Sequence, residues 1–289
     1  MDAAVSQTRV EKVVSPASYA VFGNPIKHSK SPVIHRAFSE QFEHELSYRA
    51  VRVGLDDFEA AVERFFDGGG SGLNVTVPFK ERAFALADEA SPRAARAGAA
   101  NVLLPLGDGI LRCDNTDGLG LVRDMVANNG WNVTGRRVLI LGAGGAVRGV
   151  LQPLLGERPH SVVIANRTST KAEVLAKDFA DMEVPITGGG YTELEGQTFD
   201  LIINGTSAGL QGDLPPLPAN LRVSEKCCCY DMVYGSEPTP FMRWSAAHAA
   251  WAICDGLGML VEQAAESFYL WRGLRPATGP VIKDLRNQL

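Results

Sequence analysis

The sequence predicts an α/β protein made of two domains, and three observations support this fold class. The chain has 289 residues, which is more than a single hydrophobic core usually holds together. Short apolar and β-branched runs alternate with amphipathic segments from end to end, the pattern of βα units around mostly parallel sheets. These runs form two series that meet near Asp117. We therefore expect two sheets, each with its own covering helices.

Strand positions follow from short apolar runs that turn residues separate. The expected strands are 19–23, 46–53, 72–77 and 101–106 in the first series and 137–141, 161–165, 199–204 and 227–232 in the second. Gly107, Asp108 and Gly109 lie between one of these strands and a further run at 110–113, so the chain should form a tight hairpin there. This hairpin would place one antiparallel strand in an otherwise parallel first sheet.

Two helices outside the regular alternation set the expected domain bounds. The segment 118–129 carries apolar residues and stops at Gly130, as a connecting helix would. The segment 257–271 has an apolar stripe, and because the second series is complete before it, we expect this helix to pack on the first domain. The predicted division is 16–116 plus 256–289 for a mixed, mostly parallel domain, 117–255 for a second domain, and 1–15 for a flexible tail.

Composition excludes several classes of protein. The chain is 45% hydrophobic and 21% charged with a formal net charge of −5, so it should be soluble and has no general field for nucleic acid or an anionic membrane. No run approaches the roughly 18 apolar residues of a membrane span. The five cysteines suit neither a disulfide framework nor a zinc site, which predicts a reduced cytoplasm and no metal. Cys227, Cys228 and Cys229 should lie in a buried strand.

A glycine-rich turn follows the first strand of the second series. Strand 137–141 leads directly into Gly142, Ala143, Gly144, Gly145 and Ala146. In a Rossmann-type fold such a turn lets the backbone approach a dinucleotide pyrophosphate at a helix N-terminus. The match to G-x-G-x-x-G is imperfect because Val147 occupies the third small position. A purely structural tight turn is the alternative interpretation.

The end of the next strand indicates which dinucleotide is bound. An NAD enzyme is expected to place Asp or Glu there for the adenosine ribose. This chain instead has Asn166, Arg167 and Thr168, with Lys171 one turn further. Two cations without a carboxylate suit a ribose 2′-phosphate, because charge-assisted hydrogen bonds recognise phosphate strongly. The pattern predicts NADP(H), with a solvated basic strand end as the alternative.

A loop near the N-terminus has the features of an anion site. Ser29 and Ser31 precede Pro32, which is favoured at the first position of a helix. Ser31 is expected at the helix N-cap. Hydroxyl groups and free N–H groups at a helix start can hold a carboxylate. Capping alone would explain Ser31 but not Ser29.

Lys80 ends the segment 74–80 just after a predicted strand. A lysine in such a place is more often a solvated surface group. Polar residues also mark other element ends, with Asn101 opening a strand and Asn115, Thr116 and Asp117 at the domain junction. A lysine held by a carboxylate in a cleft between domains can donate a proton to a developing alkoxide. The sequence therefore offers Lys80 and Asp117 as a catalytic pair.

Six segments together resemble the shikimate dehydrogenase family, in the family's order and from about residue 18 to the end of the chain. They are 19–32, 74–80, 114–118, 142–146, 166–168 and 255–264. The resemblance implies an NADP-dependent oxidoreductase acting on a CH–OH group, which reversibly reduces 3-dehydroshikimate to shikimate. This step belongs to the pathway to chorismate and the aromatic amino acids. It also implies a small-molecule substrate and a monomer or homodimer.

The resemblance also implies a role for each matching residue. Lys80 and Asp117 would be the catalytic pair. The substrate would be bound by Ser29, Ser31, Thr76, Lys80, Asn101, Asp117, Tyr234 and Gln263, with the two serines on its carboxylate. NADP would be bound by Gly142, Ala143, Gly144, Gly145, Ala146, Asn166, Arg167, Thr168 and Lys171, with Met232 and Gly256 facing the nicotinamide.

Departures from the family pattern and rival functions remain. Lys171 stands where many relatives carry Arg, which costs a planar two-point contact. The rivals within the family are a quinate/shikimate dehydrogenase that uses NAD and a paralogue acting on an aminated analogue. A non-catalytic sensor of nucleotide or shikimate is a rival of another class, but it would not need Lys80 and Asp117. A folate-linked dehydrogenase would lack the paired serines.

Overall fold

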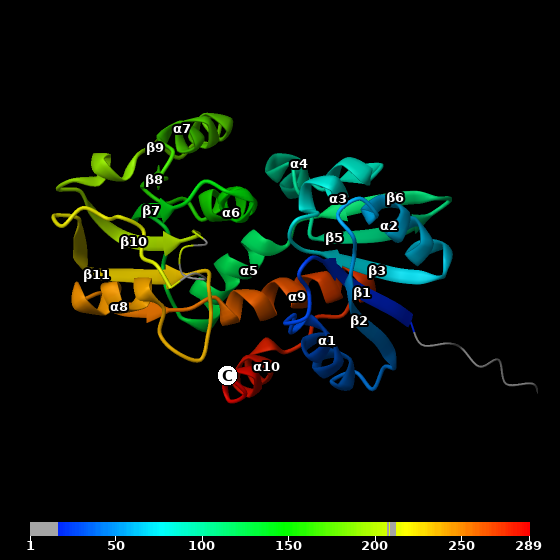
Figure 1. The fold of residues 1–289 in the computed structure, drawn as a ribbon. Helices are drawn as coiled ribbons and strands as arrows, with labels where there is room; N and C mark the ends of the chain where they lie inside the picture. The colour runs from blue at the N-terminus through cyan, green and yellow to red at the C-terminus, as the bar shows by residue number, and fades with distance from the viewer. Residues whose placement is uncertain (1–16, 207, 209–211) are drawn as a thin grey trace, which may run out of the picture.

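The computed structural model describes residues 17–206, 208 and 212–289, so the tail predicted at 1–15 lies outside the described residues. Two six-stranded sheets form two lobes, and the helices α5 (Asp117–Arg123) and α9 (Leu257–Arg272) run between them (Figure 1). The α/β fold class with two sheets is confirmed.

The first sheet has the strand order β2-β1-β3-β5-β6-β4. Its strands are β1 (Ala17–Gly23), β2 (Leu46–Arg52), β3 (Gly70–Val75), β4 (Glu89–Ala90), β5 (Val102–Gly107) and β6 (Ile110–Asp114), with helices α1 (Ser31–Glu40), α2 (Phe58–Asp67), α3 (Lys80–Leu86) and α4 (Pro92–Ala97) between them. The predicted hairpin is confirmed, because β5 runs antiparallel to both β3 and β6. Its turn residues Gly107, Asp108 and Gly109 all have positive φ, the backbone conformation that tight hairpins need.

The second sheet is parallel throughout, in the order β12-β11-β10-β7-β8-β9. Its elements are β7 (Arg137–Leu141), α6 (Gly145–Gly156), β8 (Ser161–Ala165), α7 (Ser169–Asp178), β9 (Ile186–Gly189), the 3₁₀ turn η2 (Tyr191–Leu194), β10 (Thr198–Asn204), β11 (Arg222–Asp231), α8 (Pro240–Ala247) and β12 (Ala252–Cys254). This is the doubly wound order of dinucleotide-binding folds, in which ligands bind beyond the strand ends where the order reverses. Here that point lies between β7 and β10.

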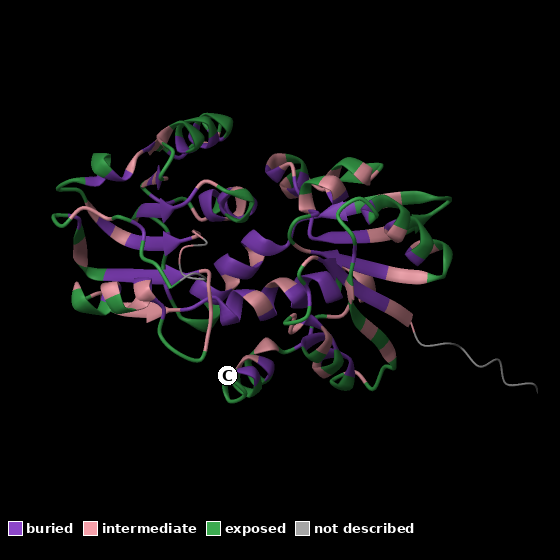
Figure 2. Ribbon diagram, viewed as in Figure 1, coloured by how far each residue is buried: buried purple, intermediate pink, exposed green. Residues whose placement is uncertain are grey.

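The second sheet is buried on both faces, as Figure 2 shows for its central strands. Cys228 packs into the core on one side of the sheet, while Cys227 and Cys229 pack into the core on the other. Helices cover both faces of a parallel sheet, so successive side chains of β11 all lose contact with water. The prediction of a buried strand for the cysteine run is confirmed.

The segment that was expected as one connecting helix has two parts. It begins as α5 and continues as the π-helical turn η1 (Asp124–Asn128). Helix α9 lies against both parts and against α1, and the terminal helix α10 (Thr278–Arg286) completes this packing. Ile34 and Phe38 of α1 share one apolar cluster with Val261 and Phe268 of α9. None of the helices in the described part of the chain is long and apolar enough to cross a bilayer.

Candidate active site

Lys80 and Asp117 meet at the junction of the two lobes. Lys80 is the first residue of α3 and Asp117 the first residue of α5. The Lys80 Nζ lies 2.5 Å from Asp117 Oδ2, although the two residues are 37 positions apart. The Lys80 side chain keeps 25% of its surface exposed and Asp117 keeps 10%. A partly accessible ammonium is thus held in place by a nearly buried carboxylate.

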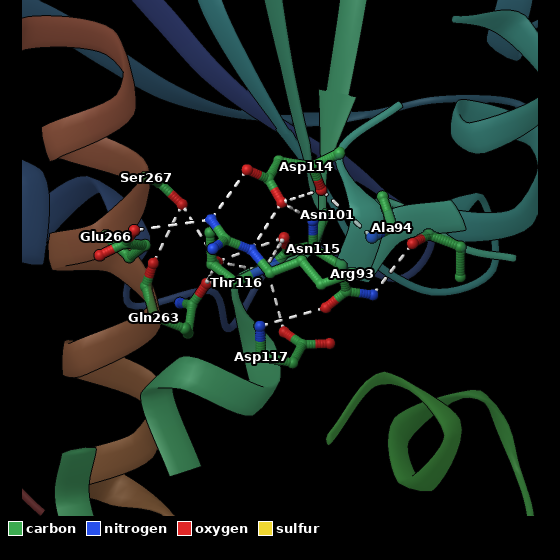
Figure 3. A network of polar contacts seen from close by, with 12 residues as sticks. Arg93, Ala94, Asn101, Asp114, Asn115, Thr116, Asp117, Gln263, Glu266 and Ser267 are labelled. Atoms are coloured by element: carbon green, nitrogen blue, oxygen red, sulfur yellow. Dashed lines mark hydrogen bonds and ion pairs between the residues drawn. The ribbon is translucent and has the colours of Figure 1, made fainter. Parts of the chain in front are cut away.

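Asn101 fixes the other oxygen of this carboxylate, as Figure 3 shows. Its Nδ2 donates to Asp117 Oδ1 at 2.8 Å, and its Oδ1 accepts the backbone N–H of Thr116 at 2.8 Å. The Asn115 side chain in turn accepts the N–H of Asp117 at 3.2 Å. Because both oxygens of Asp117 are engaged, the carboxylate has one defined orientation toward Lys80.

Helix α9 brings Gln263 to the same point. Gln263 Oε1 lies 3.2 Å from Asn101 Nδ2, and Gln263 Nε2 donates to the Leu260 carbonyl at 2.8 Å. One turn further, Ser267 accepts a hydrogen bond from Asn74, which also donates to the Asn101 carbonyl. Segments from three distant parts of the chain therefore form one polar wall.

Lys80, Asp117, Asn101, Gln263 and Asn74 line a cavity of about 350 Å³. Its lining includes every residue expected at the substrate, namely Ser29, Ser31, Thr76, Lys80, Asn101, Asp117, Tyr234 and Gln263, together with Met232 and Gly256. Gly256 approaches Met232 so closely that an added Cβ would lie 2.2 Å from the Met232 carbonyl oxygen. Asn74, Met259 and Leu260 also line the cavity and were not predicted, because an asparagine inside a strand and apolar residues on a helix have no distinctive pattern.

The anion loop differs from expectation at one residue. Ser31 is the first helical residue and not the N-cap, since Lys30 already has helical φ and ψ and stands at that position. Ser29 does what was expected of Ser31, because its Oγ accepts the backbone N–H of Ser31 at 3.3 Å. Both hydroxyl-bearing residues still line the cavity.

A second cavity of about 700 Å³ lies over the glycine-rich turn. Its lining includes all the residues of that turn and strand end, namely Gly142, Ala143, Gly144, Gly145, Ala146, Asn166, Arg167, Thr168 and Lys171. Gly142 has φ of +104°, which favours glycine. Apart from the adjoining backbone, no atom of the described residues lies within 4 Å of where a Cβ would stand on Gly144 or Gly145. The open backbone at the start of α6 is therefore a place where a pyrophosphate fits.

The cations of this second cavity are free to bind a phosphate. Arg167 and Lys171 are exposed, and neither forms an ion pair with any part of the chain that the structure describes. Tyr191, Thr206 and Asp213 are among the further lining residues and were not predicted. They follow strands β9 and β10. Tyr191 directly follows the glycine run 188–190, a signal that was missed because β9 was not predicted as a strand.

Val147 does not disturb the phosphate turn. It is fully buried in the core between α6 and the sheet. Its Cγ2 lies 2.5 Å from where a Cβ would stand on Gly205, just beyond β10. The G-x-G-x-x-G pattern expects a small residue at position 147, in the helix. Here the small residue is Gly205, which faces Val147 from the end of β10, so α6 still packs closely on the sheet.

A doubly wound sheet with a dinucleotide turn, joined to a second α/β domain and with a lysine–carboxylate pair in a cavity at their junction, defines a two-domain nucleotide-dependent dehydrogenase. Three family models match this chain: "Shikimate dehydrogenase substrate binding domain" over residues 21–103, "Shikimate / quinate 5-dehydrogenase" over 124–210 and "Shikimate 5'-dehydrogenase C-terminal domain" over 256–286. The chain belongs to the shikimate dehydrogenase family.

Relatives of nearly the same length support this assignment. The shikimate dehydrogenase (NADP(+)) of Cellvibrio japonicus is 58% identical over 271 residues, covering 94% of this chain and 97% of the relative. That of Alkalilimnicola ehrlichii is 59% identical, covering 93% and 98%. Among solved structures, shikimate 5-dehydrogenase from Thermus thermophilus in complex with NADP(H) and shikimate has a TM-score of 0.83 at 33% identity. The match covers 94% of this chain and 100% of that one.

Proposed function

We propose that this protein is a shikimate dehydrogenase that reversibly reduces 3-dehydroshikimate to shikimate with NADPH. The reaction belongs to the biosynthesis of chorismate and the aromatic amino acids. The observation that carries the proposal is the Lys80–Asp117 pair, with its N–O distance of 2.5 Å, inside a cavity that also contains Ser29 and Ser31. One end of the cavity suits a carboxylate and the other suits the chemistry of a carbonyl.

The residues of the first cavity would orient the substrate. Ser29 and Ser31 bind its carboxylate through their hydroxyl groups and the N–H groups at the start of α1. Thr76, Asn101 and Gln263 bind the ring hydroxyls, and Tyr234 borders the ring. A site built from several fixed hydrogen-bonding groups discriminates strongly against analogues that lack a matching hydroxyl.

Lys80 is the proton donor for reduction. Its ammonium group stands where negative charge develops on the carbonyl oxygen, and it transfers one proton from Nζ to that oxygen. Asp117 holds the ammonium in place and stabilises its charge. In the reverse direction the neutral amine accepts the proton of the substrate hydroxyl, so the same residue serves as acid and base.

The second cavity fits NADP(H). The turn 142–146 binds the pyrophosphate, Asn166, Arg167, Thr168 and Lys171 bind the adenosine ribose with its 2′-phosphate, and Met232 and Gly256 face the nicotinamide. When bound, NADPH supplies the hydride that the reaction needs. Met232 and Gly256 line the substrate cavity, which supports direct contact between nicotinamide and substrate.

The organisation and setting of the protein belong to the same proposal. The substrate-binding domain comprises 16–116 plus 256–289, and the NADP-binding domain comprises 117–255. The protein acts in the cytoplasm as a monomer or homodimer, and neither nucleic acid nor a membrane is a partner. The net charge of −5 supports the proposal that neither nucleic acid nor an anionic membrane is a partner.

The test is to mix the purified protein with shikimate or quinate and with NADP⁺ or NAD⁺, and to follow the absorbance of reduced nicotinamide. We expect rapid reduction of NADP⁺ with shikimate, and slow reduction with the other pairs. Activity mainly with quinate and NAD⁺ would assign the protein to the paralogue instead. Binding without turnover in all four mixtures would favour a sensor.

A further inference from the structure

Arg93, near the start of α4, joins two buried carboxylates that belong to different sides of the site (Figure 3). It lines neither of the two cavities described above. We propose that Arg93 is a positioning residue that sets the separation between Asp117 and Gln263 across the ring-hydroxyl end of the substrate cavity. This inference rests on the proposed function.

The first carboxylate, Asp114, is the last residue of β6 and lies three positions before Asp117. It is only 5% exposed. Arg93 Nε donates to Asp114 Oδ1 at 2.7 Å, and Arg93 Nη2 donates to Oδ2 at 2.8 Å. A two-point contact of this kind fixes direction as well as distance.

Asp114 also bonds to the backbone of the turn that leads into Asp117. Its Oδ1 also accepts the backbone N–H of Asn115 at 2.6 Å and the hydroxyl of Ser91 at 2.5 Å. Ser91 is the N-cap of α4 and accepts the N–H of Ala94. The turn that leads into Asp117 is therefore tied to the start of α4.

The second carboxylate, Glu266, is on α9 and is also 5% exposed. Arg93 Nη2 lies 3.5 Å from its Oε1, while Arg123 and Arg275 donate to its Oε2 at 2.6 and 2.8 Å. Glu266 follows Gln263 by three residues, so the two side chains lie on neighbouring positions of one helix face. A force on Glu266 is therefore transmitted to Gln263 through about one helical turn.

Asn101 shows why this separation matters. Its single amide nitrogen lies within hydrogen-bond distance of both Asp117 Oδ1 and Gln263 Oε1. If Arg93 were removed, Asp114 would lose its two-point partner, while Glu266 would keep Arg123 and Arg275, so no side chain would join the two carboxylates any longer. The two sides would then separate, and Asn101 would lose one of its partners.

The test compares R93Q and R93K with the wild type, with R112Q as the matched control. Arg112 is an arginine of β6 that pairs with Glu89 on the surface of the same sheet. We expect R93Q to lower kcat/KM for shikimate by about 10- to 100-fold, the effect of a displacement near 1 Å. The Kd for NADP⁺, measured by fluorescence, should stay within about twofold because all its proposed contacts except Gly256 are in the other domain. R93K should restore part of the loss, and R112Q should behave as the wild type.

Calorimetric binding of shikimate separates a positioning role from a merely structural one. R93Q should bind shikimate more weakly at a temperature where circular dichroism shows it fully folded. A variant with a lower melting temperature but unchanged shikimate Kd, kcat and KM would overturn the inference. If R93Q fails to fold, R93K takes its place in the test. R93K kinetics equal to those of the wild type would then overturn the inference. A wild-type protein that neither binds nor oxidises shikimate would overturn the proposed function as well.

Discussion

At the scale of single residues, the Lys80–Asp117 contact gives the most direct prediction. Replacing Lys80 with Ala removes the proposed proton donor but leaves Asp117 bonded to Asn101. We expect kcat to fall by about 10²- to 10⁴-fold, the usual contribution of general acid–base catalysis. The Kd for shikimate should change much less. Steady-state kinetics with calorimetry measures both, and a variant that lost only affinity would refute the assigned role.

The two exposed cations of the second cavity carry the proposed preference for NADP over NAD. We expect R167A and K171A each to weaken NADP⁺ binding by about 10- to 150-fold, since a charge-assisted hydrogen bond contributes about 1.5–3 kcal/mol. Binding of NAD⁺, which has no 2′-phosphate, should hardly change. Fluorescence titration with both nucleotides gives the comparison. Equal losses for NADP⁺ and NAD⁺ would show that these side chains do not contact the 2′-phosphate.

Part of the candidate site could be predicted from sequence because its residues occupy special backbone positions. Glycines at a strand end and serines before a proline each have a pattern tied to chemistry. Lys80 has a weaker pattern, and the roles of Thr76, Tyr234, Gln263, Met232 and Gly256 were expected only from the resemblance to the family. Asn74 and Arg93 lack such a pattern. Their importance depends on which residues tertiary folding places beside them, and Arg93 joins partners that lie 21 and 173 positions away. The role of each predicted site residue in catalysis stays a prediction.

At the scale of elements, periodicity located every long strand but missed three short ones, β4, β12 and β9. They have two, three and four residues, too few for a clear repeat to appear in the sequence. The start of β11 was also placed five residues late, at Cys227 instead of Arg222, because its first residues are polar. The π-helical turn η1 was missed because it differs from an α-helix in hydrogen-bond register and not in its apolar pattern.

The packing of α5 against α6 gives a prediction for a whole element. A Cβ on Gly118 would lie 2.6 Å from Pro153 Cγ and 2.8 Å from the Gly149 carbonyl oxygen. We expect G118A to push the two helices apart and to cost about 1–3 kcal/mol of unfolding free energy, as overpacking does. Because Gly118 follows Asp117, kcat should fall too. Urea unfolding and steady-state kinetics measure the two effects.

Gly156 in α6 provides the matched control for this substitution. It is also a helical glycine and is exposed, and outside its own helix no atom of the described residues lies within 4 Å of where its Cβ would stand. G156A should therefore leave activity unchanged and should not destabilise the protein, since alanine favours a helix more than glycine does. If G118A proved as harmless as G156A, the two helices would not be in the close contact described.

At the scale of the whole molecule, His35 links stability to pH. It is 1% exposed, its ring stacks on Tyr48 at 4.2 Å, and its Nε2 has no hydrogen-bond partner among the described residues. Burial lowers the pKa of His35 to about 3, against an opposing effect of Asn74. The rings of Phe38, Phe268 and Trp271 surround it.

The direction of this effect follows from proton linkage. The unfolded chain binds a proton at His35 below its ordinary pKa of 6.5, whereas the folded protein does not until about 3. Stability is therefore complete above pH 6.5 and is lost progressively as the pH falls toward 3. Acidification from about pH 7.5 to about pH 5.5 should lower the unfolding free energy of both proteins. The loss should be roughly 1.4 kcal/mol smaller in H35F than in the wild type.

Urea unfolding at the two pH values checks this, with H160Q as the control because His160 is exposed. H160Q should keep the pH dependence of the wild type. If H35F and the wild type lost the same free energy on acidification, His35 would be accessible to protons in the folded protein.

The return of α9 and α10 to α1 also has a consequence for how the protein is made. The apolar face formed by Ile34 and Phe38 is covered by residues of the last two helices, including Val261 and Val281. During synthesis on the ribosome, this face emerges long before the residues that cover it. The lobe of the first sheet therefore stays incomplete and prone to aggregation until the end of synthesis, while the lobe of the second sheet, formed by the middle of the chain, can already fold as a unit. A chain that stopped before residue 257 would keep its dinucleotide turn but would lack Gln263 and Glu266, so the catalytic site is complete only after α9 has been synthesised.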